Sequence, residues 1–369
     1  MLMESTPQAT QKTPLRLLII TQIVDRKDPA LGFFARWIEE LALRTEQISV
    51  ICLKKGEYTL PENVAVVSLG KEQTDSASLP HLYLRLRYIL RFYRALFRAR
   101  GTYDVVFVHM NEEYVLLAGL WWRLVGTPVF LWRNHYAGSP QTHVAAFLAT
   151  RVFCTSRYSY TARFAKTKIM PVGVDVDSVH LDEAIDRVPR SILFLARFDK
   201  SKRPELLVEA LAMLHVRGVR FTATFVGGPT EATSMYPNEV KALAEARGIG
   251  SLCTFTGAVP NTETYRYYRS HEIFVNCSKS GMLDKTIFKA AAAGCLALSS
   301  SEDVAQYVDA SCIFKDNDAA DLSRALEYLL ESTPERRTDM SHQFAALVEQ
   351  NTLSVLADKL TEEMSAKAQ

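Results

Sequence analysis

The stretch Val105-Val-Phe-Val-His109-Met-Asn111-Glu112-Glu113 places a short apolar run directly before a group of polar side chains. Such a run, rich in β-branched residues, is typical of a strand buried on both faces, as in parallel sheets covered by helices. In a doubly wound sheet, ligands bind beyond the carboxyl ends of the strands. The polar residues that follow the run are therefore candidates for a site, and repetition of this pattern decides the fold.

The same pattern recurs along the whole 369-residue chain, with amphipathic stretches between the runs. Alternation of this kind predicts an α/β fold made of two doubly wound, Rossmann-like parallel sheets. The predicted strands are 15–21, 48–53, 64–68, 105–109, 128–132, 152–155 and 168–171, then 192–196, 222–226, 253–256, 273–277 and 296–299.

The chain is about twice as long as a typical domain, which also predicts two domains. Periodicity is weak over 175–190, and a new strand-and-helix alternation starts after it. The expected parts are a disordered N-terminus (1–14), an N-terminal domain (15–177), a linker (178–190) and a C-terminal domain (191–340). The end of the chain looks helical over 340–367 and has no strand after it. Residues 341–369 could therefore pack on either domain, including by crossing back to the first.

The composition excludes several classes of protein. A net charge of +2 gives no general attraction to nucleic acid. The six cysteines are scattered without paired spacing, which indicates buried thiols in a reducing compartment rather than disulfides or a metal site. Residues 1–12 lack the apolar centre of a signal peptide, and Arg123, Gly126 and Pro128 interrupt the most hydrophobic stretch, 114–132. We therefore expect a cytoplasmic protein.

Polar residues and glycine follow several predicted strands of the first half. Gly32 opens the helix after the first strand, where a glycine lets backbone N–H groups approach a phosphate; a plain turn glycine is the alternative. His109 ends one predicted strand, and His135 follows another within Arg133-Asn-His135. Two strands that each deliver a histidine to one edge favour a site, although each histidine alone could be structural.

The second half carries a basic loop and a mixed polar segment. Arg197-Phe-Asp-Lys-Ser-Lys202-Arg203 precedes a helix, where basic side chains oppose the helix dipole, so the loop favours a nearby diphosphate. A solvated basic loop is the alternative. Asp284-Lys-Thr286 stands before a small-residue helix and joins a carboxylate, an ammonium and a hydroxyl, a suitable set for a sugar or diphosphate. An ordinary capping aspartate is the alternative there.

These pieces, in this order, resemble the family 4 glycosyltransferases, whose GT-B fold consists of two Rossmann-like domains facing a cleft. The resemblance covers about 15–330. It implies transfer of a sugar from a nucleotide diphosphate sugar, with a UDP-sugar favoured, with retention of the anomeric configuration and without a metal or other cofactor. It is carried by Asp104-Val-Val-Phe-Val-His109, Trp132-Arg-Asn-His135, Pro171-Val-Gly-Val-Asp175, Ala196-Arg197 through Lys202, and Gly257-Ala-Val-Pro260.

The resemblance also implies roles for single residues. The catalytic candidates are His135 and His109. The donor diphosphate would contact Arg197, Lys202 and Gly32. The donor sugar would contact Gly281, Met282, Leu283, Asp284 and Lys285. The nucleoside would contact Gly227, Val259, Pro260, Thr286 and Lys289.

The sequence departs from the family at two important positions. The family usually has two glutamates eight residues apart, and the alignment places Gly281 and Lys289 there. Gly281-Met-Leu-Asp284-Lys285 resembles a branch with Gly-x-x-Asp-Lys, in which Asp284 and Lys285 take over the sugar contacts. That branch retains the second glutamate, so Lys289 could instead reach a phosphate or an acidic sugar, or mark a weakened enzyme. The alternative function is a catalytically silent homologue that binds a nucleotide sugar or scaffolds a glycan-assembly complex.

An amphipathic helix is predicted over 81–100. Its arginines Arg87, Arg91, Arg94 and Arg98 fall in one stripe, and its other side carries Leu86, Ile89, Phe92, Tyr93, Leu96 and Phe97. Such a helix is typical of a binder to an anionic membrane surface, which would suit a lipid-linked acceptor or growing glycan at the inner face of the cell membrane. The alternative is a helix that packs its apolar side on the first sheet, with its arginines in water. A dinucleotide-dependent oxidoreductase is disfavoured because no G-x-G-x-x-G follows a strand.

Overall fold

The structure, a computed structural model, describes residues 12–28, 31–73, 81–176, 185–229, 233–281 and 283–368. It divides into unit 1 (1–154, 161–170 and 354–369) and unit 2 (155–160 and 171–353). The predictions made for 1–11 of the N-terminus, for 178–184 of the linker and for Met282 lie outside the described residues, as do 29–30, 74–80, 177, 230–232 and 369 of the other predicted parts.

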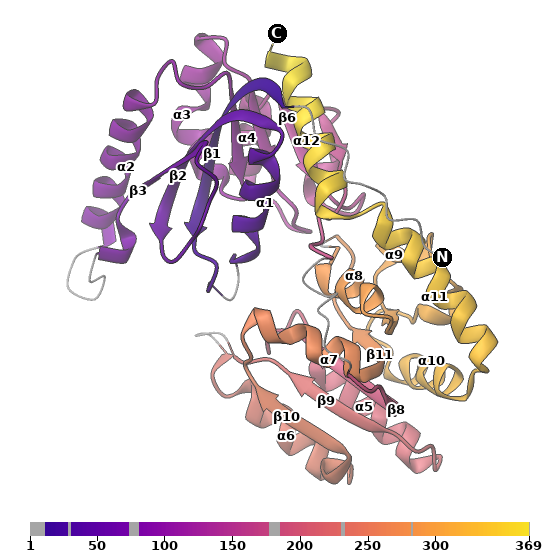
Figure 1. The fold of residues 1–369 in the computed structure, drawn as a ribbon. Helices are drawn as coiled ribbons and strands as arrows, with labels where there is room; N and C mark the ends of the chain where they lie inside the picture. The colour runs from indigo at the N-terminus through magenta and orange to yellow at the C-terminus, as the bar shows by residue number, and fades with distance from the viewer. Residues whose placement is uncertain are drawn as a thin grey trace. The chain divides into compact units, whose positions relative to one another are not determined.

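Unit 1 is built on a seven-stranded parallel sheet with the order β3-β2-β1-β4-β5-β6-β7 (Figure 1). Every residue of β4 and β5 is buried, which explains their continuous apolar runs. The chain order reverses between β1 and β4, and ligands commonly bind at such a switch point. The strands are β1 (Thr13–Val24), β2 (Thr45–Lys55), β3 (Val64–Ser68), β4 (Val105–His109), β5 (Val129–Trp132), β6 (Arg151–Cys154) and β7 (Thr167–Ile169).

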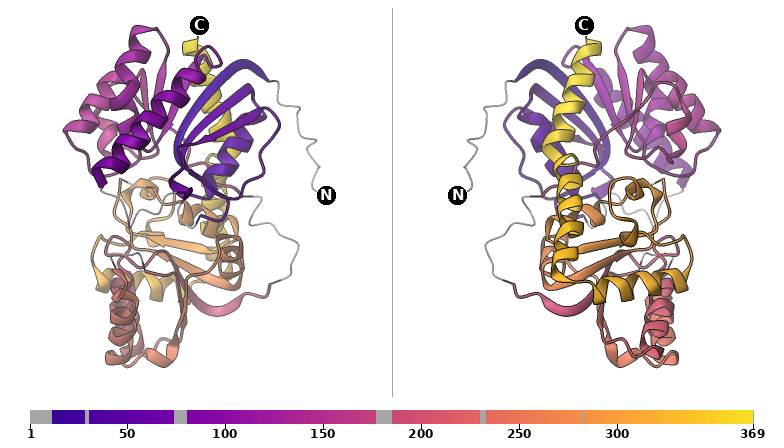
Figure 2. Two further views of the ribbon diagram at one scale, coloured as in Figure 1. Left: turned by 90° about the vertical axis from the view of Figure 1, so that its left-hand side faces the viewer. Right: turned by 90° about the vertical axis from the view of Figure 1, so that its right-hand side faces the viewer.

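The helices of unit 1 cover both faces of this sheet (Figure 1). They are α1 (Phe33–Ala42), α2 (His81–Arg98), α3 (Glu112–Leu124), α4 (Pro140–Leu148) and, from the end of the chain, α12 (Leu353–Ala368). Helix α12 runs along unit 1 (Figure 2). The buried guanidinium of Arg44 holds it there, because Nε donates to Asp358 Oδ1 at 2.6 Å and Nη2 donates to Ser354 Oγ at 2.6 Å.

Unit 2 is built on a five-stranded parallel sheet with the order β10-β9-β8-β11-β12. Its strands are β8 (Val188–Leu195), β9 (Thr222–Val226), β10 (Cys253–Gly257), β11 (His271–Asn276) and β12 (Leu296–Ser299). Its helices are α5 (Pro204–Val216), α6 (Tyr236–Ala246), α7 (Thr264–Ser270), α8 (Lys285–Ala292), α9 (Glu302–Ala305), α10 (Ala319–Glu331) and α11 (Pro334–Glu349). A single apolar core joins this sheet to its helices. The two parallel α/β sheets confirm the predicted fold class.

The end of the chain differs from its prediction, because the helix expected over 340–367 is two helices. The chain leaves the helical path between α11 and α12, where Thr352 forms a bridge with Val174. Asn351 stabilises this break, since its Oδ1 accepts from the Val172 N–H at 3.0 Å and its amide donates to Leu347 O at 2.9 Å. A local polar side chain therefore ends a helix that periodicity alone would continue.

Helix α2 has three faces rather than the two expected. Phe92 and Leu96 are buried against the sheet. Leu86 and Phe97, predicted on the same apolar side, are instead 53% and 59% exposed. Their exposed sector also carries Leu82, Tyr83 and Leu90, and the arginine stripe lies directly beside this sector on the helix surface. The apolar side is therefore divided between the core and solvent.

None of the described helices combines the length and the apolar content that crossing a membrane requires. No disulfide joins any of the six cysteines, all of which lie in the described ranges. Five of these thiols are buried, as the sequence predicts, and Cys253 is half-buried. Burial raises the pKa of Cys277 to about 12, which makes the thiol unreactive at neutral pH.

Candidate functional site

Three loops meet at the carboxyl edge of the sheet in unit 2, after β8, β9 and β10. Gly227 is central to this arrangement: its N–H donates to Gly257 O at 2.9 Å, and its φ is +146°. A Cβ at Gly227 would lie 1.8 Å from Ala196 O, so no other residue fits there without moving the loop after β8. The Phe198 N–H donates to Gly228 O at 2.8 Å and ties the same two loops together.

A nearly buried ion pair links the basic loop after β8 to the start of α8. Lys202 Nζ lies 2.5 Å from Asp284 Oδ2, and both side chains are 13% exposed. Lys202 Nζ also donates to Ser278 Oγ at 3.1 Å, and the Asn276 amide donates to Asp284 Oδ2 at 3.2 Å. Burial by itself would raise the pKa of Asp284, but the charge and hydrogen bond of Lys202 outweigh it and lower that pKa below its usual range.

Helix α8 begins at this ion pair. Asp284 is its N-cap, with Oδ1 accepting from the Thr286 N–H at 3.1 Å, so the capping role weighed from the sequence is present together with the ion pair. The Thr286 hydroxyl oxygen accepts from the Asn276 amide at 3.4 Å. Asp284 and Thr286 of the predicted set therefore lie together at one helix end, but the ammonium group beside Asp284 belongs to Lys202, whereas the predicted Lys285 bonds to another loop.

Helix α8 itself carries two lysines, and both of them donate to neighbouring loops of unit 2. Lys285 Nζ donates to Gly173 O at 3.2 Å, and Lys289 Nζ donates to Asn261 Oδ1 at 3.3 Å. Burial lowers the pKa of Lys285, and the charge of Lys289 lowers it further. Burial also lowers the pKa of Lys289, against the opposing charges of Asp175 and Asp284. Both ammonium groups are disfavoured in this setting, and an arriving anion would stabilise them.

Arg203 shapes the site without having been predicted as a contact. It is the N-cap of α5, with φ +50°, and its side chain is buried. Nε donates to Cys277 O at 2.8 Å, and Nη2 donates to Asp316 Oδ1 at 2.5 Å. Arg203 therefore clamps the segment that leads from β11 to Asp284. The local sequence does not show that Arg203 has a different role from its neighbour Lys202, because the partners of Arg203 lie 74 and 113 residues away along the chain.

The other predicted donor contacts lie around this cluster. Arg197 is on the same loop as Lys202, with its side chain 60% exposed and its Nη2 3.8 Å from Asp199 Oδ2. Gly281 has φ +97°, and its N–H donates to the buried Asp303 carboxylate at 2.9 Å. Leu283 and Val259 pack against the core, and Pro260 precedes the turn that contains Asn261.

Sequence reasoning also missed Asn276, Ser278 and Asp303. Asn276 and Ser278 form hydrogen bonds in the segment that leads from β11 to α8, and Asp303 of α9 accepts from the Gly281 N–H of that segment. The position of Asn276 at the end of a strand was a signal that the sequence offered.

The remaining predicted residues belong to unit 1. His109 ends β4 and is 1% exposed, with its ring stacked on Phe34 at a centroid distance of 3.7 Å and Nδ1 3.3 Å from Thr21 Oγ1. His135 follows β5 and is more open, and its Nδ1 accepts from the Ala137 N–H at 2.9 Å.

Gly32 is the N-cap of α1. A Cβ there would lie 2.6 Å from Asp28 O, so close packing requires glycine at this position.

Solved structures share this architecture over nearly the whole chain. HepE of Anabaena, solved in complex with UDP, matches with a TM-score of 0.73 at 15% identity and covers 95% of this chain and 100% of its own. Sucrose-phosphate synthase of Thermosynechococcus elongatus matches with a TM-score of 0.70 at 16% identity, over 95% and 98% of the two chains. The chain has the GT-B fold.

Sequence comparisons relate part of this GT-B chain to a protein family and to a curated protein. Residues 189–332, all within unit 2, match the family described as Glycosyl transferases group 1. The D-inositol 3-phosphate glycosyltransferase of Frankia alni is 28% identical over 147 residues, which is 37% of this chain and 36% of that protein. The chain thus aligns with about a third of the length of this curated relative. The Lys202–Asp284 pair and the lysines of α8 lie inside the matched residues.

Proposed function

We propose that this chain is a family 4 glycosyltransferase that transfers a sugar from a nucleotide diphosphate sugar, favouring a UDP-sugar. The observation that carries the proposal is the group of cationic side chains at the carboxyl edge of the sheet in unit 2, formed by Arg197, Lys202, Lys285 and Lys289. Structures of HepE, which has the same fold, are described as complexes with UDP and with UDP-glucose, and this supports a nucleotide sugar as donor.

In the proposed complex, Arg197 and Lys202 hold the diphosphate, together with Gly32 of unit 1. Lys202 Nζ already lies 2.5 Å from the Asp284 carboxylate. The diphosphate therefore either shares the Lys202 ammonium group with that carboxylate or displaces the carboxylate from it. The donor sugar contacts Gly281, Met282, Leu283, Asp284 and Lys285. The nucleoside contacts Gly227, Val259, Pro260, Thr286 and Lys289. Cationic side chains and the start of α8 take the place of a metal ion.

The proposed reaction retains the anomeric configuration. In a front-face route, the leaving phosphate takes the acceptor proton, so no strong general base is required. His135 then orients the donor sugar or stabilises developing charge, with His109 as the second candidate. Turnover that is unchanged in excess EDTA would agree with the proposed metal independence, and loss of turnover that Mg²⁺ restores would contradict it.

Replacement of Arg197 tests the diphosphate contact. Arg197→Ala removes a charge-assisted contact, so we expect UDP affinity to fall by about tenfold or more and turnover to fall with it. Lys200→Ala is the matched control because its side chain, on the same loop, is 72% exposed. UDP at about a hundred times its dissociation constant should stabilise the wild-type protein by about 2.7 kcal/mol in thermal unfolding without metal. Normal turnover of the Arg197 variant would remove this assignment.

A catalytically silent homologue is the second candidate function. The observation that favours it is that Gly281 and Lys289 stand where the family usually has two glutamates. Lys289→Glu separates the candidates when turnover and nucleotide binding are measured together. Restored or increased turnover indicates a degraded site, whereas loss of an existing activity indicates that Lys289 has been put to another use.

We further propose that α2 lies against an anionic membrane at the cytoplasmic face, where the acceptor is lipid-linked or a growing glycan. The exposed sector of α2 combines Leu82, Leu86, Leu90 and Phe97 with neighbouring arginines, the composition of an interfacial helix. Flotation with vesicles of phosphatidylcholine alone and with added phosphatidylglycerol tests the idea. Leu86→Ser with Leu90→Ser should reduce binding to the anionic vesicles. No binding of the wild-type protein would reject it.

A further inference from the structure

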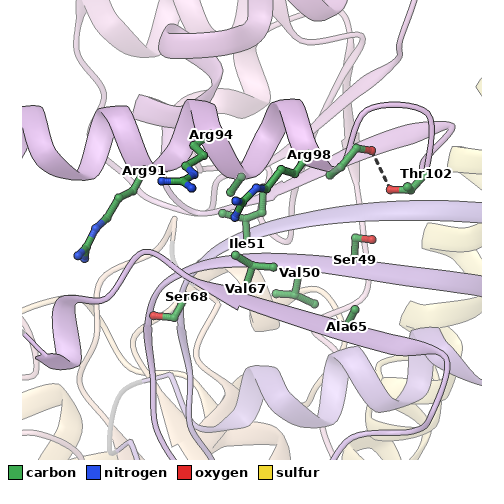
Figure 3. Close-up of a pocket in the computed structure, with 12 residues that line it drawn as sticks. Ser49, Val50, Ile51, Ala65, Val67, Ser68, Arg91, Arg94, Arg98 and Thr102 are labelled. Carbon is green, nitrogen blue, oxygen red and sulfur yellow. Dashed lines mark hydrogen bonds between the residues drawn. The ribbon is translucent and has the colours of Figure 1, made fainter.

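A groove in unit 1 separates the arginine flank of α2 from the edge of the sheet (Figure 3). Its volume is about 590 Å³, within the range of about 300–1,000 Å³ that small-molecule sites occupy. All its lining residues belong to β2, β3, α2 and the turn after α2. None of them was assigned a role in the proposed donor site.

The floor of the groove is formed by small and apolar side chains of two paired strands. Ser49 of β2 pairs with Ala65 of β3, and Ile51 pairs with Val67, so these four side chains share one face of the sheet. Val67 is 49% exposed although it belongs to a strand, because α2 does not cover this part of β3. The small residues Ser49 and Ala65 leave the space that the groove occupies.

The wall of the groove is cationic. Arg91, Arg94 and Arg98 line it, and Arg94 and Arg98 extend from α2 over the strands (Figure 3). Arg91 is anchored, because its Nη1 donates to Leu69 O at 2.6 Å. Within the part of the chain that the structure describes, Arg94 and Arg98 form no ion pair with a carboxylate, and α2 contains no acidic residue. Like charges at this helical spacing repel one another.

We infer that this groove binds a phosphate-type oxyanion, held by the guanidinium groups of Arg94 and Arg98. Residues four apart on a helix are neighbours, so the two forks can converge on one tetrahedral anion. A bound phosphate removes the mutual repulsion of the arginines, and the apolar floor limits competition from water. The phosphate could belong to a soluble compound or to a lipid headgroup, since both present the same oxygens. The inference stands independently of the proposed donor site, which uses residues of unit 2.

Site-resolved protection of arginines from phenylglyoxal tests the inference with the wild-type chain. The protein is labelled in phosphate-free buffer alone, with inorganic pyrophosphate, or with vesicles of phosphatidylcholine that contain or lack phosphatidylglycerol. Peptide mass spectrometry then gives the labelling rate of each arginine, which separates the groove from the donor site around Arg197. We expect saturable protection of Arg94 and Arg98 by about threefold or more, since a bound oxyanion occupies both forks. The control arginines Arg85 and Arg100, exposed and outside the groove, should be unchanged.

Each outcome either supports or overturns the proposed oxyanion site. Protection by pyrophosphate identifies a soluble phosphate as sufficient, and protection only by anionic vesicles identifies a lipid headgroup as the source. Equal protection of Arg85 and Arg100 in every condition indicates general charge screening and overturns the inference, as does the absence of any protection.

Variants check the result. Arg94→Gln should weaken pyrophosphate-dependent protection of Arg98 by about tenfold, because one of the two charge-assisted contacts is lost. Arg85→Gln, which removes the same charge outside the groove, should leave that protection unchanged.

Discussion

Replacement of Asp284 by asparagine gives the sharpest test of the site in unit 2. Asparagine caps a helix about as well as aspartate, so the start of α8 is retained while the charge opposite Lys202 is lost. Both partners are 13% exposed and 2.5 Å apart, which makes this a nearly buried pair. Removing one partner of a buried pair costs about 3–5 kcal/mol, and the partial exposure favours the lower end, about 3 kcal/mol.

The assay is thermal and urea unfolding of Asp284→Asn at pH 7. For a domain the size of unit 2, about 3 kcal/mol lowers the melting temperature by roughly 6–12 °C. Glu239→Gln is the matched control, because it removes one partner of the exposed pair between Lys200 and Glu239 in the same unit and should change little. Adding Lys202→Met to Asp284→Asn should recover part of the loss, since no unpaired charge then remains buried.

The pH dependence gives an independent check. The folded-state pKa of Asp284 is lowered, so its contribution is fully present above the ordinary aspartate pKa of about 3.9. The contribution is lost as the pH falls through the lower folded-state value. The stability difference between wild type and Asp284→Asn should therefore stay constant from pH 7 to about 5 and shrink only in stronger acid. A variant as stable as the wild type at pH 7 would refute the role given to this pair.

Three further predictions concern unit 2. Gly227→Ala should unfold well below the wild type, because its Cβ would lie 1.8 Å from Ala196 O, whereas Gly218→Ala, at φ +75° with no atom within 4 Å, should show only backbone strain of about 1–3 kcal/mol. Gly281→Ala should also lower the melting temperature, because φ is +97° there, and an unchanged value would contradict the backbone described. Burial lowers the pKa of His271, so the unfolding free energy of the wild type should fall as the pH drops below about 6.5, a decrease that His271→Gln should lack in urea titrations at pH 7 and 5.

The strands were predictable because buried parallel strands carry a local signal. The runs over β4 and β12 show this best, since continuous apolar residues are bounded by polar ones and the predicted bounds equal the observed ones. The start of β8 was less visible. It begins at Val188, four residues before the predicted 192, and includes the exposed Val188 and the positive-φ residue Arg190. Polar and exposed residues at a strand end carry no periodic signal.

Contacts between distant parts of the chain could not be predicted from the sequence. Lys202 and Asp284 were both candidates, but the pair between them spans 82 residues and follows only from the sheet order. The sequence also did not predict which face of α2 packs against the sheet. Its periodicity shows where the arginines lie, but not that Leu86 and Phe97 stay in solvent while Phe92 is buried.

The return of α12 to unit 1 sets an order for the synthesis of this chain. Arg44 leaves the ribosome well before its partner Asp358, which is 314 residues further along the chain. Residues 171–353 can fold around their own core while the ribosome is still adding the rest, because domains generally fold as units during translation. Unit 1 is therefore completed only after residues 171–353 have been made, and until α12 has been made unit 1 presents to chaperones the surface that α12 later covers.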